Sequence, residues 1–259
     1  MHEFDVTFRF RSKPNTSYSF DSVIEHGGIR IETKDGKICG RATISIERDD
    51  HNFAREKAVE ELERLASVLT IIFGEAFAVE DVKVEHKPII ENEGKFKKIT
   101  LFETIQIKEE VFIDKKYSKE SLDEIKGELK GLIDKINKLR EGKVLLRAIK
   151  WWRKGNLEED KIDKFLDYFI SFEMLASIKG YKSKYGEEWA GKFSDDYSIT
   201  HKPDEEMSVN SIRNKIMHEP GPEKEKAEKL ANQYADSFGE EVLKAIKKII
   251  NENPSIELT

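Results

Sequence analysis

An internal disulfide is impossible in this chain because Cys39 is its only cysteine. The sequence also lacks any run of about 20 apolar residues, the length that a membrane-spanning helix needs. Its first residues show neither the basic start nor the apolar stretch of a secretion signal. These absences exclude a disulfide-stapled scaffold, and we expect a cytoplasmic protein that does not associate with a membrane.

Signals for metal or phosphate-loop chemistry are also missing. The six histidines are scattered, and none stands at metal-ligand spacing from Cys39 or from another histidine. The glycine pair that follows His26 resembles no phosphate-binding loop and indicates a turn. We therefore expect neither a metal ion nor a cofactor.

Basic residues are in the minority in the first part of the chain. Residues 1–114 hold 17 Lys and Arg against 23 Asp and Glu, whereas residues 115–259 hold 28 of each. The whole net charge of −6 therefore lies in the first part. A protein that coats nucleic acid nonspecifically needs a broad basic face, so that function is excluded. A local basic pocket formed on dimerisation stays allowed.

The beginning of the sequence has the pattern of β-strands. Apolar side chains alternate from Phe4 to Phe10, which is the period of a half-buried strand. Two further strand-like stretches flank Asp35 and Gly36, a pair that favours a tight hairpin turn.

A helix is predicted to follow these strands. Apolar residues recur at helical spacing over residues 58–72, and Gly74 is placed to cap the helix end. Two more strand-like stretches come at 82–85 and 99–107. We predict an α+β domain of unknown role over residues 1–114.

The pattern becomes helical after residue 114. An apolar series with steps of three and four predicts an amphipathic helix that stops near Gly142. The predicted helices cover about 122–139, 145–155, 158–179 and 211–218, with a short helix in the aromatic-rich connection before the fourth and a last long helix after Pro222. We predict an all-α bundle over residues 115–259.

Glu173 is an anomaly in the third predicted helix, because it lies on the apolar stripe with Phe169 and Ala176. A carboxylate that faces a core is costly unless it is paired or hydrogen-bonded. We therefore expect a cationic partner for Glu173, and the best candidate lies in the segment that contains Arg213. A purely structural ion pair, or a helix rotated enough to expose Glu173, is the alternative.

Arg213 and His218 stand about 140° apart round the fourth predicted helix and roughly 7.5 Å apart along it. Because Pro220 disfavours helical geometry at Glu219, we expect this helix to stop at His218. Histidine exchanges a proton near neutral pH, and arginine binds phosphate through a fork of N–H groups. Asn214 adds an amide that can orient either side chain. On these residues alone, a structural role with His218 as a capping residue is the more frequent outcome.

Three segments occur in an order that resembles the Apea-like branch of the HEPN domains. They are LRAIKWWRKG at 146–155, DKFLDYFISFEMLA at 163–176 and RNKIMH at 213–218. The glutamate shortly before Leu-Ala and the Arg-x4-His with a polar residue after the arginine both match that family. The resemblance covers about the last 140 residues and says much less about the N-terminal part.

The resemblance implies a dimeric bundle that brings two Arg–His pairs into one cleft, and a metal-independent RNase activity. Arg213 and His218 would be the catalytic pair, with Asn214 and Glu173 in support. A ribose 2′-hydroxyl would attack the adjacent phosphate, leaving a 2′,3′-cyclic phosphate and a 5′-hydroxyl. We therefore expect a homodimeric endoribonuclease with an RNA substrate. Its setting would be antiphage defence or a toxin–antitoxin system, with an antitoxin or regulatory partner.

The alternative is a noncatalytic HEPN-like module for RNA binding, ligand binding or dimerisation, because a fold does not fix an activity. The acidic first half and the lack of an overt basic face favour it. Trp151 and Trp152 could stack on bases. The more frequent outcome for such a pair is that one tryptophan faces the core and the other faces a dimer interface. His201 is expected to be a solvated loop residue, with a place in the site as its alternative.

Overall fold

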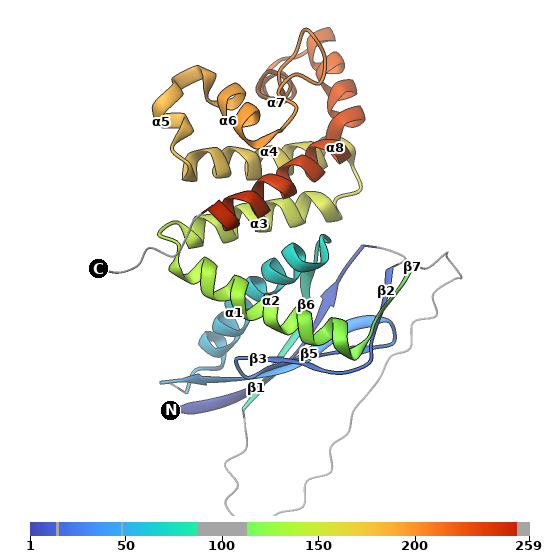
Figure 1. Ribbon diagram of the computed structural model, residues 1–259, viewed down its shortest axis with the longest axis vertical. Helices are drawn as coiled ribbons and strands as arrows, with labels where there is room; N and C mark the ends of the chain where they lie inside the picture. Colours follow the sequence, from blue (N-terminus) through green and yellow to red (C-terminus); the bar gives the residue numbers. More distant parts are fainter. Residues whose placement is uncertain (14–15, 48, 87–112, 253–259) are drawn as a thin grey trace, which may run out of the picture.

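The computed structural model describes residues 1–13, 16–47, 49–86 and 113–252, and it shows an antiparallel-sheet region followed by a helical region (Figure 1). The strands are β1 (His2–Arg11), β2 (Thr16–Phe20), β3 (Ile24–His26), β4 (Ile29–Lys34), β5 (Lys37–Ile46), β6 (Ala78–His86) and β7 (Ile113–Tyr117). The helices are α1 (His51–Phe73), α2 (Lys119–Lys138), α3 (Gly142–Leu157), α4 (Lys161–Ile178), α5 (Tyr181–Tyr185), the 3-10 turn η1 (Gly186–Glu188), α6 (Trp189–Tyr197), α7 (Val209–His218) and α8 (Pro222–Glu252).

The N-terminal sheet has five antiparallel strands in the order β3-β4-β5-β1-β6. Alternate residues of β1 from Phe4 to Phe10 are buried and those between them are exposed, which confirms the predicted half-buried strand. The turn between β4 and β5 also confirms its prediction. Asp35 and Gly36 both have positive φ, at 52° and 72°, as a two-residue turn of this kind requires.

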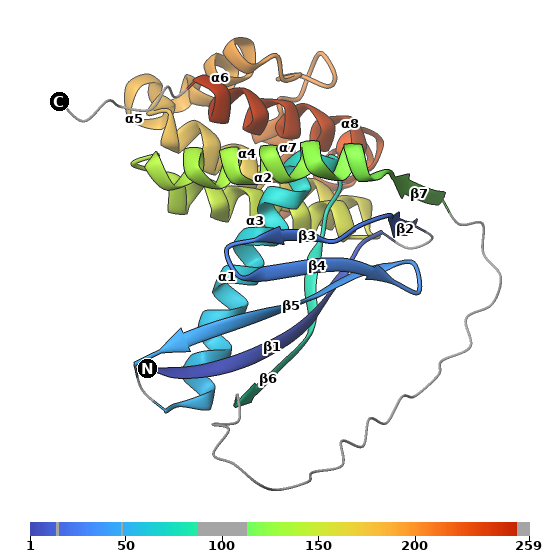
Figure 2. The ribbon, with the colours of Figure 1, turned by 60° about the horizontal axis from the view of Figure 1, so that its bottom comes forward.

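Helix α1 buries its apolar stripe against the sheet, and Figure 2 shows it running from the sheet toward α2 and α3. The Asp50 side chain caps its start by accepting hydrogen bonds from the backbone N–H groups of Asn52 and Phe53. Gly74 ends it in the left-handed conformation, with φ of 71°. The predicted helix and its glycine cap are therefore confirmed.

The connection to the helical region runs through β7, which pairs in parallel with β2. Ser118 follows β7 directly and caps α2 by accepting from the N–H of Ser121. The predicted boundary after residue 114 thus falls inside a strand that pairs with the first region, and the division into two domains stays a prediction. The strand predicted at 99–107 lies outside the described residues.

Helix α4 is the centre of the helical region and packs against α3 and α8. Its aromatic residues Phe165, Phe169 and Phe172 are buried and form tilted ring contacts along α4, and Phe165 and Phe172 also contact Phe238 of α8. The shorter helices α5 to α7 lie beyond α4 on the far side from the sheet (Figure 1). The predicted helical character of the C-terminal part is confirmed, including short helices in the aromatic-rich connection.

Helices α3, α4 and α8 meet closely at Gly239. A Cβ atom built there would lie 2.3 Å from the Tyr168 ring, so only glycine leaves room for that ring. The indole Nε1 of Trp152 donates to the Gly239 carbonyl at 2.6 Å. Trp152 is therefore a core residue, whereas Trp151 is half-buried, with the Lys154 ammonium 5.0 Å from its ring centre.

The two regions are joined by a buried arginine on α3. The Arg153 side chain is only 5% exposed, and its guanidinium lies 3.1 Å from the Glu63 carboxylate of α1. It also donates to the Glu63 carbonyl and to Ser67 Oγ, each at 3.0 Å. Burial lowers the pKa of Arg153, and Glu63 opposes that effect. This ion pair fixes α1 against α3.

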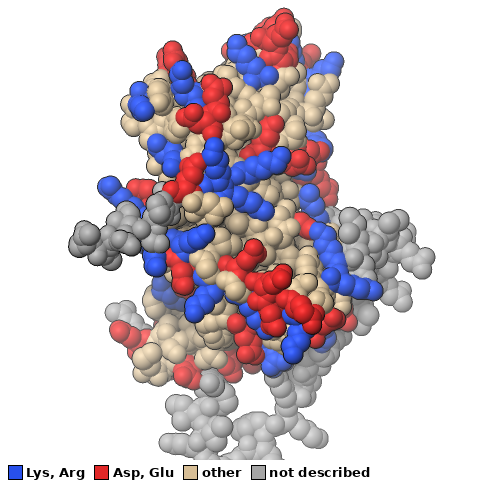
Figure 3. Space-filling view, viewed as in Figure 1, with Lys and Arg blue, Asp and Glu red and all other residues tan. Residues whose placement is uncertain are grey.

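No helix in the described part of the chain is long and apolar enough to cross a bilayer. On the face drawn in Figure 3, lysine and arginine side chains alternate with aspartate and glutamate side chains, and neither sign covers the whole face.

Candidate functional site

Helix α7 carries the Arg-x4-His segment, and its ends are set by local sequence. Ser208 caps its start, because its hydroxyl accepts from the backbone N–H of Ser211 at 3.1 Å. Its last residue is His218, since Glu219 is extended, with φ −106° and ψ 134°, ahead of Pro220. The predicted end of the helix is confirmed.

One face of α7 is buried and the other is turned to solvent. Val209, Ile212 and Ile216 are buried, and α7 packs mainly on α8. Helical geometry then places the polar residues of the segment on the open side. We call Arg213, Asn214, Met217 and His218 the exposed turn of α7; Arg213 is half-buried and the other three are exposed.

Arg213 is held in place without being neutralised. One of its terminal nitrogens donates to Asn214 Oδ1 at 3.0 Å, and its guanidinium carbon lies 6.0 Å from the centre of the Phe169 ring. Within the described residues, no carboxylate forms an ion pair with it. A guanidinium positioned by an amide and an aromatic ring keeps most of its N–H donors available for a phosphate.

His218 lies at the C-terminal end of α7 with its side chain exposed. In the described part of the structure, its ring makes neither a hydrogen bond nor an ion pair. Access to solvent leaves both ring nitrogens free to meet a substrate. The pair of an arginine for anionic charge and a histidine for proton transfer is suited to phosphate-ester chemistry.

Glu173 does not have the partner that the sequence suggested. Its carboxylate pairs with the Lys182 ammonium of α5, and the two side chains are 36% and 40% exposed. Lys182 also lies over the Trp189 ring, which contacts Phe169 beneath Arg213. Glu173 therefore lies one turn along α4 from the ring that supports Arg213, without pairing with Arg213 itself. Glu173 has a cationic partner, as expected, but the prediction that this partner comes from the segment that contains Arg213 was wrong. The structure instead has the stated alternative, an ion pair at a partly exposed position.

The physical reason is that α4 is enclosed by neighbours on several sides, so no single apolar stripe identifies its core face. The buried carboxylate of α4 is Asp167, whose side chain is 6% exposed and lies 3.0 Å from the Lys154 ammonium. Burial raises the pKa of Asp167, and Lys154 opposes the shift. Sequence reasoning missed this pair because its members lie on different helices and share no period.

His201 is less exposed than predicted and is not one of the residues of the exposed turn. It is half-buried in the loop before α7, and its Nδ1 is buried without a hydrogen-bond partner among the described residues. Burial lowers its pKa, and Lys202 adds to the shift. A cavity of about 280 Å³ adjoins it, bordered also by Gly191 and by Asn210 of α7. The spacing of His201 in the sequence gave no signal of this burial.

The described residues show no cluster of side chains typical of a metal site. No group of three or more His, Cys, Asp or Glu side chains there is arranged to hold a metal ion. Cys39 is a free, half-buried thiol on β5, and burial raises its pKa.

Comparisons with known proteins give no relative for this chain. No family model matches it, and searches of curated proteins and of solved structures likewise give no match. The HEPN-like assignment therefore stays a prediction from the three sequence segments.

Proposed function

We propose that this protein is a metal-independent endoribonuclease of HEPN type that acts on single-stranded RNA or RNA loops, where the 2′-hydroxyl is accessible. The observation that carries the proposal is the exposed turn of α7. Arg213 has no carboxylate partner among the described residues, Asn214 holds its guanidinium, and His218 is open to solvent.

In the proposed reaction, the ribose 2′-oxygen forms a bond to the adjacent phosphorus and the bond from phosphorus to the 5′-oxygen breaks. His218 takes part in the proton transfer, in which the 2′-hydroxyl loses a proton and the leaving 5′-oxygen gains one. Arg213 stabilises the charge that develops on the phosphate oxygens. The products are a 2′,3′-cyclic phosphate and a 5′-hydroxyl.

The proposal includes a homodimer that brings two exposed turns of α7 together. Met217 supports it, because this large apolar side chain is 52% exposed between the polar residues of the turn. A second copy of α7 would cover it and place a second Arg213–His218 pair nearby.

The test is incubation of purified protein with mixed RNA in EDTA, in parallel with His218→Ala. We expect cleavage by the wild type alone, with cyclic-phosphate ends and a loss of about 10²-fold or more in the variant. Lys215→Ala is the matched control, since Lys215 lies on the same helix and pairs with Glu219 and Glu223 instead.

Two results would contradict the proposal. One is RNA that stays intact with the wild type, and the other is cleavage that His218→Ala leaves unchanged. Melting temperatures close to that of the wild type must accompany the loss of activity, because a large drop would assign His218 a structural role.

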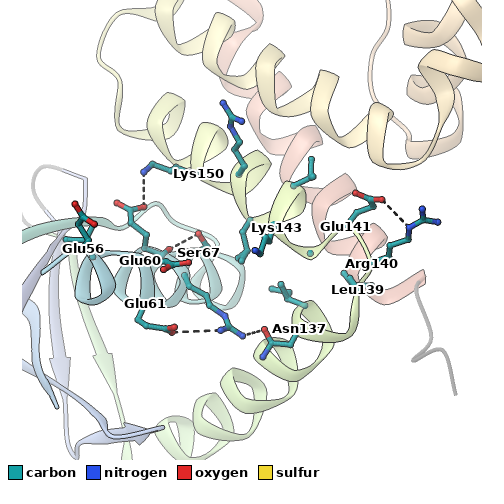
Figure 4. A pocket seen from close by; sticks show the side chains of 18 of the residues that line it. Glu56, Glu60, Glu61, Ser67, Asn137, Leu139, Arg140, Glu141, Lys143 and Lys150 are labelled. Atoms are coloured by element: carbon teal, nitrogen blue, oxygen red, sulfur yellow. Dashed lines mark hydrogen bonds and ion pairs between the residues drawn. The ribbon is translucent and has the colours of Figure 1, made fainter. Parts of the chain in front are cut away.

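A noncatalytic interaction module is the second candidate, and one observation favours it. A groove of about 1310 Å³, which we call the α1–α3 groove, is bordered by α1, by the end of α2 and by α3 (Figure 4). The helices that border it lie between the sheet and α7 in Figure 1.

A further inference from the structure

The α1–α3 groove has an aliphatic floor. Val59 of α1, Leu139 of the α2–α3 turn, and Val144 and Leu146 of α3 border it, and all four are half-buried. Partly exposed apolar side chains that line an open groove offer surface from which a partner can exclude water. The floor therefore favours an occupant with an apolar face.

One wall of the groove is predominantly basic, although Glu141 also borders it and lies 3.8 Å from Arg140. Lys143, Arg147 and Lys150 follow one another on α3 at steps of four and three, which places them along one stripe, and Arg140 extends it. Lys150 lies 3.6 Å from Glu63 across the groove. Lys143 and Arg147 are exposed and have no ion-pair partner in the described part of the chain.

The opposite wall is predominantly acidic. Glu56, Glu60 and Glu63 follow one another on α1 at the same steps of four and three. Figure 4 shows Glu60 and Lys143 on opposite sides of the opening. Glu60 pairs with Lys57 of its own helix at 2.7 Å. Because these two stripes carry opposite charge, the groove is polarised across its width.

Two arginines moderate the acidic wall without reversing it. Arg64 donates a hydrogen bond to Asn137 of α2 and lies 3.9 Å from the Glu61 carboxylate. Its positive charge is therefore balanced mainly within the wall. Arg55 lies near the start of α1 and borders the same groove. Glu63 is also paired, with Arg153 and Lys150 of α3. Of the α1 carboxylates that border the groove, Glu56 is the one that forms no ion pair among the described residues.

This charge arrangement disfavours nucleic acid as the occupant. A phosphate backbone attracted to the α3 wall would lie against the carboxylates of the α1 wall. The volume also exceeds the usual range for a small-molecule site. A helix about 10 Å across that rises 1.5 Å per residue fills such a volume with roughly 11 residues, or three turns.

We infer that the α1–α3 groove docks an amphipathic α-helix of a partner protein, with the apolar stripe of that helix on the floor, its basic flank along α1 and its acidic flank along α3. Helix-in-groove binding of this kind takes its affinity from apolar anchors and its selectivity from flanking charges. The inference does not depend on the proposed RNase activity.

The probes that test it are three fluorescent peptides of about 12 residues, each held helical by a side-chain staple, since so short a helix is marginal in water. All carry the same leucine stripe. One has a lysine flank and a glutamate flank, one has lysine on both flanks, and one has glutamate on both. By fluorescence anisotropy, we expect the mixed peptide to bind the wild-type protein at least about tenfold more tightly than either of the others.

Charge-reversed proteins then locate the binding. Lys143→Glu with Arg147→Glu should move the preference to the all-lysine peptide. Glu56→Lys with Glu60→Lys should move it to the all-glutamate peptide. The reversed residues are exposed, so unchanged melting temperatures are expected and are the control for folding.

A wild-type protein that binds no peptide, or the same order of preference in all three proteins, would overturn the inference. Binding of labelled polyuridylate that the α3 reversal abolishes would assign the groove to nucleic acid instead. If either reversed protein fails to fold, the test is the peptide preference of the wild-type protein with and without added salt. Salt must remove the preference for the mixed peptide if that preference comes from the two walls.

Discussion

Arg153 at the junction of α1 and α3 and Arg213 on the exposed turn of α7 are the same residue type in opposite settings. Arg153 is enclosed, with a carboxylate, a carbonyl and a hydroxyl around its terminal nitrogens. Arg213 donates a hydrogen bond to one side-chain amide, and an aromatic ring lies beneath its guanidinium. The first arginine has both terminal nitrogens hydrogen-bonded within the fold, whereas the second keeps donors for another molecule.

This difference shows how architecture and chemistry are divided in the molecule. Removing Arg153 leaves the Glu63 carboxylate without its closest cation where water has little access, so the free energy of unfolding should fall. Removing the charge of Arg213 from the exposed turn leaves no carboxylate unpaired among the described residues, so we expect an effect mainly on the binding of another molecule there. The four predictions below test that division, from the largest expected effect to the smallest.

The largest effect is expected for Arg153→Ala. The variant leaves the Glu63 carboxylate without its closest cation and empties a buried space, so we expect a loss of about 3–5 kcal/mol in the free energy of unfolding. Urea denaturation measures it. Arg147→Ala, an exposed position on the same helix, is the control and should change stability by less than about 0.5 kcal/mol. A loss below about 1 kcal/mol for Arg153→Ala would mean that the junction does not depend on this pair.

Arg213→Ala should show the reverse profile. On the proposed mechanism, we expect RNA cleavage to fall by about 10²–10³-fold, because one charge-stabilising group is removed. Stability should fall by no more than about 1 kcal/mol, the usual contribution of a cation–π contact at a partly exposed site. Cleavage assays and urea denaturation on the same preparation check both parts. Undiminished cleavage would remove Arg213 from the mechanism.

His201 is expected to make stability depend on pH. Burial lowers its pKa in the folded protein below the ordinary value of 6.5, so the unfolded chain takes up a proton more readily. The free energy of unfolding should therefore be greater above pH 6.5 and decrease as the pH falls through that value. Urea denaturation of wild type and His201→Asn across this range gives the test. The variant should lose part of the dependence, and an identical slope in both proteins would contradict the assignment.

The smallest effect is expected for Lys182→Ala, which breaks a pair whose side chains are more than one-third exposed. We expect a loss of about 0.5 kcal/mol or less, because solvent screens such pairs. A double-mutant cycle with Glu173→Gln measures the coupling. A coupling above about 1 kcal/mol would show that this pair is part of a tighter network around Phe169 and Trp189.

Much of the fold was predictable because local signals agree with the final packing. The alternation from Phe4 to Phe10, the Asp35-Gly36 turn and the Gly74 cap each specify a local geometry, and the structure has all three. The short strand β2 and its parallel partner β7 were not predicted. Their pairing joins residues about 100 positions apart, and neither strand has a strong period of its own.

The candidate site was predictable only in part. The end of α7 at His218 follows from Pro220, and the open side of the helix follows from helical geometry. The partner of Glu173 depended on where α5 folds back, which no local pattern specifies. The Arg153–Glu63 pair was equally hidden, since a hydrophobic pattern marks which residues are buried but not which buried charges meet.

Gly239 has a consequence for how the sequence can vary. Three helices meet at this position, with the Tyr168 ring in the space that a Cβ atom would need and the Trp152 indole hydrogen-bonded to the Gly239 carbonyl. Even one added methyl group collides with the ring, and no rotamer choice at position 239 relieves a clash at Cβ. In a library of random single substitutions selected for folded protein, we expect position 239 to return glycine alone. Its neighbours on the outer side of α8 should return many residue types.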